Sequence, residues 1–155
     1  MNSVLLETTT HPVRYTDIDL RGHVNNALYF VYAQEAMSSA LLDNDVPIYQ
    51  TEFHPIIIET YCKYFHPIKF PETLKLNVYL LDIHQTRTFS VVTEIKSDTD
   101  ENIRYAMVGS RGLWFDFIRN IVVKMPMYFV NKVAQLKSIN NNLQDELIKF
   151  KCGIK

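Results

Sequence analysis

The sequence predicts one α+β domain in which a long buried helix is wrapped by an antiparallel sheet. Three observations favour it: an unbroken apolar stretch of helical type at 26–42, four successive strand-like runs between 56 and 115, and elements that do not alternate as βαβ units. A chain of 155 residues is long enough for one domain with a real core. The expected division is 1–128 for this domain and 129–155 for a C-terminal amphipathic helical extension of the same domain.

The central helix is predicted at 26–42, where NALYFVYAQEAMSSALL is rich in Ala, Leu and Met and has no Gly or Pro. Apolar positions go almost all the way round it. The remaining polar strip is thin and consists of Gln34, Glu35, Ser38 and Ser39. A helix that is apolar on most sides is expected to be wrapped by other elements.

The wrapping elements are predicted as strands at 56–65, 73–83, 89–96 and 103–115, with an earlier strand near 11–16, because these runs are β-branched and aromatic. Within LKLNVYL, alternation places Leu74, Leu76, Val78 and Leu80 on one face. SDTDEN at 97–102 has turn composition. The expected sheet is a meander of five to six long antiparallel strands.

The end of the chain predicts an amphipathic helix, with apolar residues at helical spacing: Val133, Leu136, Ile139, Leu143, Leu147 and Phe150. The asparagines at 140–142 could interrupt it. This helix is expected to dock either on the sheet or on a partner subunit. Because one central helix covers one face of a sheet, the other face is expected to meet a second copy of the chain, in a homodimer or a dimer of dimers.

Composition excludes several classes of function. The chain has 16 Lys and Arg residues against 17 Asp and Glu residues. It therefore lacks the excess of basic residues that is typical of a nucleic-acid-binding protein. The two cysteines, Cys62 and Cys152, have no metal-ligand or CxxC spacing, and reduced thiols in the cytoplasm are expected. The N-terminal residues have neither signal-peptide nor anchor character, and no run of about 18 apolar residues predicts a membrane span.

The densest polar chemistry lies in RYTDIDLRGHVNNALYF, at 14–30. If the early strand continued to Asp19, the carboxylates of Asp17 and Asp19 would share a face. Gly22 permits a positive φ, and Asn25 or Asn26 is expected to cap the helix. Both aspartates could be plain turn and capping residues. The chemical alternative is a hydrolase, with an aspartate as base or nucleophile and helix N-terminal amides as an oxyanion hole.

The segment VRYTDIDLRGHVNNALYFVYAQEA resembles the signature of the 4-hydroxybenzoyl-CoA thioesterase family of the hotdog fold: aromatic, x, Asp, x, Asp, two residues, Gly, then His-Val, Asn-Asn and a Tyr three positions on. YCKYFHPIKFPETLKLNVYLLDI and WFDF at 114–117 resemble later family strands less specifically, and Pro71-Glu72 replaces the usual Gly-Asp. The resemblance implies an acyl-CoA thioesterase, with coenzyme A as part of the substrate and no cofactor or metal.

The resemblance also implies roles for single residues. Asp19 matches the catalytic carboxylate, as general base or nucleophile, and Asn26 supplies the amide that polarises the thioester carbonyl. His23 matches an assisting histidine of related acyl-carrier thioesterases, but Arg21 stands where those have Asn, so His23 either assists or braces the loop. The residues expected to contact substrate are Gly22, Val24, Asn25, Tyr29, Thr88 and Ser90.

Other candidates have simpler explanations. Glu35 could be the helix carboxylate of another hotdog subgroup, although a polar strip usually reaches solvent. Cys62 is expected to be a core thiol and Ser110 an ordinary strand residue. Nothing matches a metal-ligand spacing. Cations available for the phosphates of coenzyme A are scattered, and none is singled out: Lys63, Lys69, Arg87, Arg104 and Arg111.

Two rival functions stay open at this point. The first is a non-catalytic acyl-CoA-binding or regulatory hotdog domain, because the same pocket could hold a ligand without cleaving it. The second is a hotdog dehydratase acting on hydroxyacyl thioesters, which would need His23 and Glu35 as a dyad.

Overall fold

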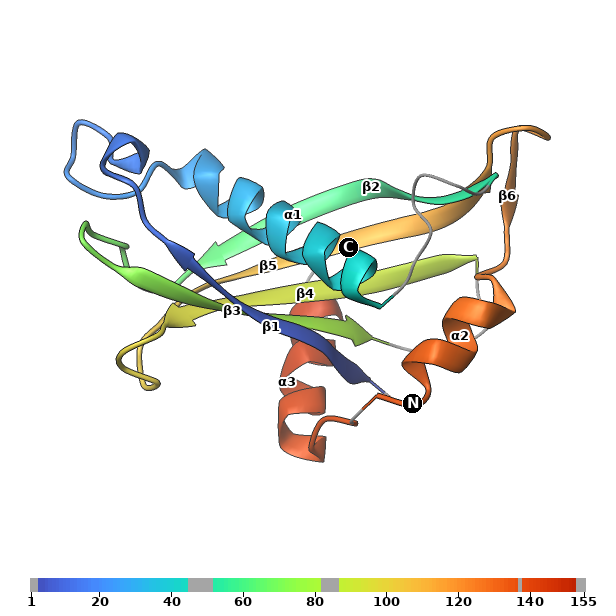
Figure 1. Ribbon diagram of the computed structural model, residues 1–155. Coiled ribbons are helices and arrows are strands. Elements are labelled where there is room, and N and C mark those ends of the chain that lie inside the picture. The colour runs from blue at the N-terminus through green and yellow to red at the C-terminus, as the bar shows by residue number, and fades with distance from the viewer. Residues whose placement is uncertain (1–2, 45–51, 82–86, 137, 153–155) are drawn as a thin grey trace.

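The computed structural model describes residues 3–44, 52–81, 87–136 and 138–152. Strand β1 (Val4–Pro12) leads through the 3-10 turn η1 (Tyr15–Asp17) to helix α1 (Asn26–Asp43). The elements that follow are β2 (Phe53–Tyr64), β3 (Thr73–Leu81), β4 (Thr88–Ser97), β5 (Arg104–Asp116), β6 (Ile121–Val123), α2 (Met127–Val133) and α3 (Asn141–Cys152). The predicted α+β class is confirmed: a long central helix lies against a six-stranded antiparallel sheet, as in the hotdog fold (Figure 1).

The strand order of the sheet is β1-β3-β4-β5-β2, with β6 paired to β5. The meander β3-β4-β5 and the turn at 97–102 are as predicted, but β2 pairs with β5 and not with β3. The segment 65–72 joins β2 to β3 across the end of the sheet. Eight extended residues reach at most about 27 Å, enough to pass three strand spacings of roughly 4.8 Å each. The order of β2 and β3 in the sequence therefore does not make them neighbours in the sheet.

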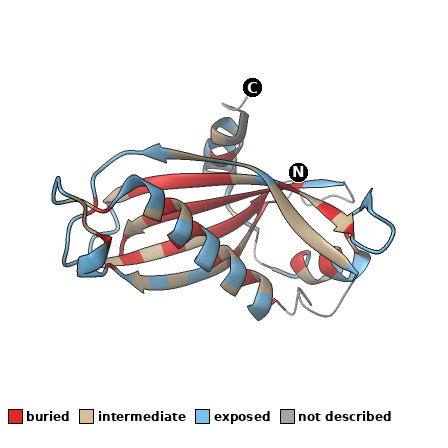
Figure 2. Cartoon of the chain, turned by 90° about the horizontal axis from the view of Figure 1, so that it is seen from above, coloured by how far each residue is buried: buried red, intermediate tan, exposed pale blue. Residues whose placement is uncertain are grey.

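Helix α1 crosses one face of the sheet (Figure 1), and buried positions recur along it (Figure 2). These buried residues are Tyr29, Tyr32, Ala33, Ala36 and Ala40. The predicted alternation in β3 holds, since Leu74, Leu76, Val78 and Leu80 pack in the same core cluster as α1. The three alanines allow the helix to lie close to the strands, which positions its N-terminus over one end of the sheet.

The opposite face of the sheet is covered by α3 of the same chain (Figure 1). Leu147 of α3 is buried against Tyr79, Leu81, Val92 and Met107 of the central strands. The expectation that this face needs a second copy of the chain was therefore wrong in its reasoning, because the C-terminal amphipathic helix docks there. The surfaces left open for assembly include the sheet edges, β1 and β2.

Two element boundaries differ from the sequence prediction. The early strand ends at Pro12 and does not extend to Thr16. The C-terminal helix is two helices, since α2 ends at Val133 and α3 begins at Asn141. The side-chain oxygen of Asn140 accepts the Leu143 backbone N–H at 2.8 Å. This asparagine side chain caps α3 and explains why the asparagine run interrupts the helical pattern.

Candidate active site

The loop between β1 and α1 folds into a tight reversal. Ile18 and Val24 form an isolated antiparallel bridge. The Asp19 N–H donates to the His23 carbonyl at 2.8 Å, and the Gly22 N–H donates to the Asp19 carbonyl at 3.0 Å. Gly22 has φ +77°, the left-handed conformation that its sequence position predicted. The reversal presents Asp19 and His23 opposite one another at its base.

The early strand ends at Pro12 and does not continue to Asp19. The carboxylates of Asp17 and Asp19 therefore do not lie on one face of a strand. Asp17 is buried, and its Oδ2 accepts the Tyr32 hydroxyl at 2.7 Å and the Arg14 backbone N–H at 2.9 Å. Burial would raise its pKa, but these hydrogen bonds and the Arg14 charge outweigh burial and hold the pKa of Asp17 below its usual value. Asp17 therefore fixes the loop to α1 as a structural carboxylate.

Asp19 is partly exposed and keeps most of its hydrogen-bonding capacity. Its Oδ1 accepts the Arg21 backbone N–H at 2.8 Å, an arrangement typical of an Asx turn. The other carboxylate oxygen has no hydrogen bond within the described ranges of the chain. That oxygen is available to a ligand, to water or to a reacting carbonyl carbon.

Asn25 is the N-cap of α1, since its side-chain oxygen accepts the Ala27 N–H at 2.9 Å. Its own N–H donates to the Asp17 carbonyl at 3.0 Å, and the Val24 N–H donates to the Ile68 carbonyl at 2.9 Å. The Asn26 N–H has no acceptor among the described residues. The first free amide of the helix is thus Asn26, where the helix dipole adds positive potential.

An open depression, here termed the loop pocket, brings these groups together in a volume of about 560 Å³. Its lining includes most of the predicted site residues, namely Asp19, His23, Val24, Asn25, Asn26 and Tyr29. Val24 and Tyr29 are buried, so they shape its floor, whereas the Asn25 side chain is engaged as the cap. Arg21 also lines the loop pocket and places a cation at its rim.

The far wall of the loop pocket comes from residues that sequence reasoning did not assign to the site. The end of β2 and the following residues contribute Tyr64, Phe65, His66 and Pro67. The Tyr64 hydroxyl donates to the Asn26 carbonyl at 3.1 Å, and its ring packs edge-on against Tyr29 at 4.9 Å between centroids. Burial raises the pKa of Tyr64 to about 12, so the hydroxyl stays protonated as a donor. Only the pairing of β2 with β5 reveals this contribution.

Thr88 and Ser90, predicted to lie near the thioester, are not close to the loop pocket within one chain. Thr88 pairs with Leu113 and Ser90 with Arg111, whereas Phe65 of the loop pocket donates its N–H to the Tyr105 carbonyl at 2.8 Å. Six residues of β5 separate Tyr105 from Arg111, a distance of roughly 20 Å. The prediction rested on the position of a polar residue in the resembling family. In the register of β4 against β5, Thr88 and Ser90 lie at the end of the sheet away from the loop pocket.

Several remaining candidates are engaged elsewhere. Glu35 lies 3.6 Å from Nδ1 of His11 and does not line the loop pocket with His23, so these two side chains of one chain do not form the dyad that a dehydratase needs. Arg104 pairs with Glu94 at 2.7 Å and with Glu146 of α3. Burial raises the pKa of the Cys62 thiol to about 11, as expected of an unreactive core thiol.

Arg111 forms an ion pair with Glu59 at 3.4 Å. Lys63 lies over the ring of Phe65, 5.3 Å from its centroid, and both Lys63 and Lys69 are exposed near the loop pocket.

Within the described ranges, no cluster of three or more His, Cys, Asp or Glu side chains could hold a metal ion. In the same ranges, each helix is too short or too polar to cross a membrane.

The fold is similar to several solved structures. The PA2801 protein of Pseudomonas aeruginosa is 23% identical, with a TM-score of 0.75 over 83% of this chain and 98% of that chain. The PA5185 protein of the same organism is 19% identical, with a TM-score of 0.75 over 86% and 93%. Slr0204, a 1,4-dihydroxy-2-naphthoyl-CoA thioesterase from Synechocystis, is 16% identical, with a TM-score of 0.74 over 86% and 97%.

A comparison with curated protein sequences gives no match. Residues 13–139 match the family described as the thioesterase-like superfamily. The matched region begins just before the aspartate loop and contains all of the loop pocket. The chain therefore belongs to the thioesterase-like superfamily and is an enzyme of the thioester hydrolase class.

Proposed function

We propose that the chain hydrolyses acyl-CoA thioesters to a free acid and coenzyme A, with Asp19 as general base or nucleophile and the Asn26 amide as oxyanion donor. One observation carries the proposal: the free carboxylate oxygen of Asp19 and the unpaired N–H of Asn26 line the same open pocket. A thioester carbonyl placed between them would have a donor on its oxygen and a carboxylate beside its carbon.

The chemistry can proceed by either of two balanced routes. As a nucleophile, Asp19 attacks the carbonyl carbon, the carbon–sulfur bond breaks, and water then hydrolyses the resulting mixed anhydride. As a base, Asp19 takes a proton from water, whose oxygen attacks the same carbon before the thiolate leaves. In both routes negative charge develops on the carbonyl oxygen, where the Asn26 N–H and the start of the helix dipole stabilise it.

The rim of the loop pocket suits a coenzyme A thioester. Arg21 lines the pocket, and His66 stands across it. In the proposal these side chains contact the phosphates, for which a fixed cation is useful. A protein acting on coenzyme A thioesters with a free Cys62 would work in the cytoplasm, where thiols stay reduced.

The test is thiol release from a panel of short, long, branched and aromatic acyl-CoAs, with wild type and Asp19→Asn compared in parallel. We expect Asp19→Asn to lower kcat by about 10²- to 10⁴-fold, the usual range for loss of a positioned base. Asp145→Asn, an exposed carboxylate of α3, is the matched control and should turn over like wild type.

Wild-type rates in Asp19→Asn would remove Asp19 from the mechanism. A folded wild type that binds acyl-CoA without turnover would instead favour the non-catalytic binding domain. Circular dichroism of each variant keeps loss of activity separate from loss of fold.

A further inference from the structure

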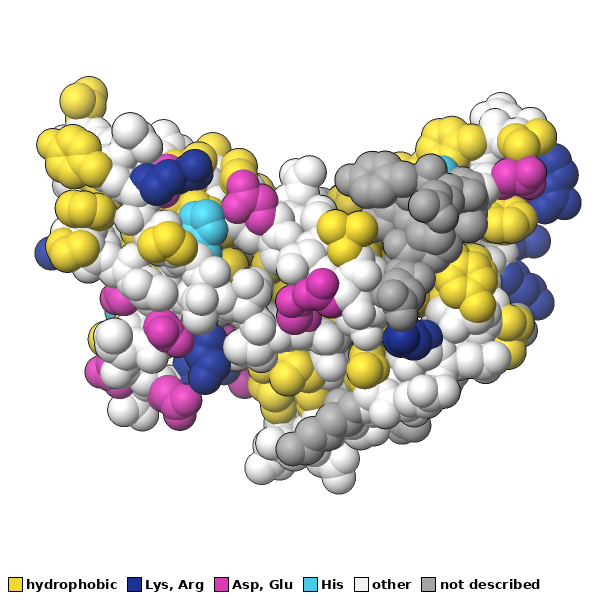
Figure 3. All heavy atoms as spheres, in the orientation of Figure 1, with side chains coloured by type: hydrophobic (Ala, Val, Ile, Leu, Met, Phe, Trp, Pro, Cys, Tyr) yellow, Lys and Arg dark blue, Asp and Glu magenta, His cyan; other side chains and the backbone are white. Residues whose placement is uncertain are grey.

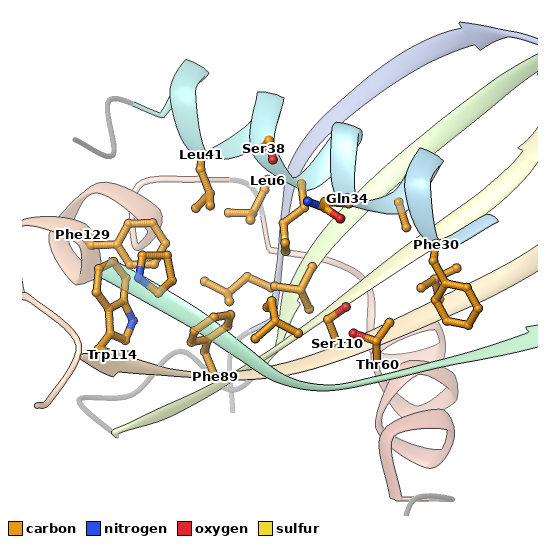
Figure 4. A pocket seen from close by; sticks show the side chains of 17 residues that line it. Leu6, Phe30, Gln34, Ser38, Leu41, Thr60, Phe89, Ser110, Trp114 and Phe129 are labelled. Atoms are coloured by element: carbon orange, nitrogen blue, oxygen red, sulfur yellow. The ribbon is translucent and has the colours of Figure 1, made fainter. Parts of the chain in front are cut away.

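A second cavity, here termed the helix cavity, lies between α1 and the sheet and has a volume of about 500 Å³ (Figure 4). One stripe of α1 forms its roof, with Phe30, Gln34, Ser38 and Leu41 among its residues. Residues of strands β1 to β5 and Phe129 of α2 form the rest of its lining. Because these helix positions recur at three- and four-residue spacing, the cavity is elongated along the helix axis.

The lining of the helix cavity is apolar and uncharged. Its polar groups are the amide of Gln34, the indole N–H of Trp114 and the hydroxyls of Ser38, Thr60 and Ser110, with no Lys, Arg, Asp or Glu among the described lining residues. A phosphate or a carboxylate would find no cationic side chain in such a space to offset the loss of its hydration. An uncharged hydrocarbon would gain by leaving water.

The two ends of the helix cavity differ. Phe30, at one end, lies one helical turn from Asn26, the proposed oxyanion donor. Aromatic rings close the other end: Trp114 lies 6.4 Å from Phe89 and 5.4 Å from Phe129 of α2, between centroids (Figure 4). Asn26 and the roof residues lie on one stripe of α1, so an acyl group held at Asn26 would point along this stripe toward the aromatic wall.

The dimensions indicate which acyl groups fit. From Phe30 to Leu41 the helix advances about 16 Å, and from Asn26 to Leu41 about 22 Å. An extended chain gains about 1.2 Å per bond, by the reach of an extended polypeptide, so these lengths hold roughly 14 to 18 carbons. A cavity of about 150 Å³ is enough for one benzene ring, so a single-ring acyl group would leave most of the helix cavity empty.

We propose that the helix cavity receives the acyl chain and that the substrates are long-chain aliphatic acyl thioesters of roughly 14 to 18 carbons. This inference rests on the proposed function, since it assumes that the thioester sits at Asp19 and Asn26. Gln34 and Ser38 line the cavity at two different distances from Asn26. Substitutions at these two positions therefore test how far the acyl chain extends along α1.

Two tryptophan substitutions measure this path. Gln34 is about 12 Å from Asn26 along the helix and Ser38 about 18 Å, which correspond to roughly 10 and 15 carbons. Gln34→Trp should lower kcat/KM at least about tenfold for chains of 12 carbons and longer, and Ser38→Trp only for chains of 16 and longer. Val31→Trp, on an exposed α1 position outside the described lining, is the matched control and should keep the wild-type profile.

The kinetic profile decides the inference. We expect wild-type kcat/KM to rise with chain length, to at least about tenfold above hexanoyl-CoA and benzoyl-CoA. If wild type prefers short or aromatic substrates and Asp19→Asn loses this activity, the inference is overturned while the proposed function stands. A uniform loss in both tryptophan variants, without a shift in preferred length, would also overturn it.

Binding separates the inference from failure of the proposed function. Calorimetric titration with hexadecanoic acid needs no turnover and can be run on wild type and Asp19→Asn alike. Binding that is retained in Asp19→Asn and Val31→Trp but lost in Gln34→Trp supports the helix cavity as an acyl site even if no acyl-CoA is hydrolysed. Absence of binding to wild type overturns it.

Discussion

At the scale of single residues, two aspartates that are two positions apart have opposite environments. Asp17 is enclosed by Tyr32 and Arg14, while one oxygen of Asp19 faces the loop pocket. Their spacing in the sequence could not reveal this difference, because the 3-10 turn at Tyr15–Asp17 rotates Asp17 inward. The likeness to a known signature favoured Asp19 as the reactive carboxylate, and the geometry gives a physical reason to treat the two aspartates differently.

Asp17 makes stability depend on pH. Its folded pKa lies below the ordinary value of 3.8, so its stabilisation is present above that pH and is lost as the pH falls through the lower folded pKa. We expect Asp17→Asn to lower the free energy of unfolding at pH 7 by about 1–3 kcal/mol and to flatten the acid side of the stability curve. Urea unfolding between pH 7 and pH 3 measures both effects. Asp145→Asn should leave the curve unchanged, and an equally steep acid limb in Asp17→Asn would contradict the assignment.

At the scale of elements, local patterns predicted what local physics determines. Alternation in β3 and the unbroken apolar run of α1 predicted both correctly, because each depends on residues within the element. The neighbours of β2 depend on how the chain crosses the end of the sheet, and no local pattern contains that information. Tyr64 therefore went unassigned, and the sequence could not show that Thr88 lies away from the loop pocket of its own chain. The helix cavity, which is lined by α1, α2 and five strands, could not be predicted from local patterns either.

In the proposed mechanism, the cap of α1 fixes the direction of the Asn26 amide. Asn25→Ala removes the acceptor for the Ala27 N–H and should cost about 0.5–2 kcal/mol of stability, whereas Asn25→Asp keeps a capping oxygen. We expect kcat to fall in Asn25→Ala because the neighbouring Asn26 amide loses its fixed direction. Urea unfolding and thiol release on the same preparations test this. Equal behaviour of the two variants would mean that the cap does not position the amide.

At the scale of the whole molecule, α3 leaves the sheet edges as the open surfaces for assembly. Strand β2 is one edge, since β5 is its sole partner in the described sheet, and it exposes Ile58 (48%) and Tyr64 (42%). Hydrophobic side chains also gather at the loop-pocket end of the molecule, where Tyr15, Leu20 and Phe70 are exposed (Figure 3). A long edge strand with apolar side chains is a template for pairing with another chain.

The prediction at this scale is a homodimer formed through β2. Antiparallel pairing of β2 with its copy is self-complementary and would continue the sheet across a two-fold axis. Light scattering should give twice the 18.1 kDa chain mass for wild type and a shift toward a single chain for Ile58→Glu, which places like charges near the axis. Ile121→Glu changes an equally exposed isoleucine (46%) on β6 and should remain dimeric. A wild type of single-chain mass would contradict the dimer, and loss of the dimer in both variants would contradict its placement on β2.

The end of β2 also forms part of the loop pocket. If pairing of β2 stabilises that part of the pocket, Ile58→Glu should raise KM for acyl-CoA.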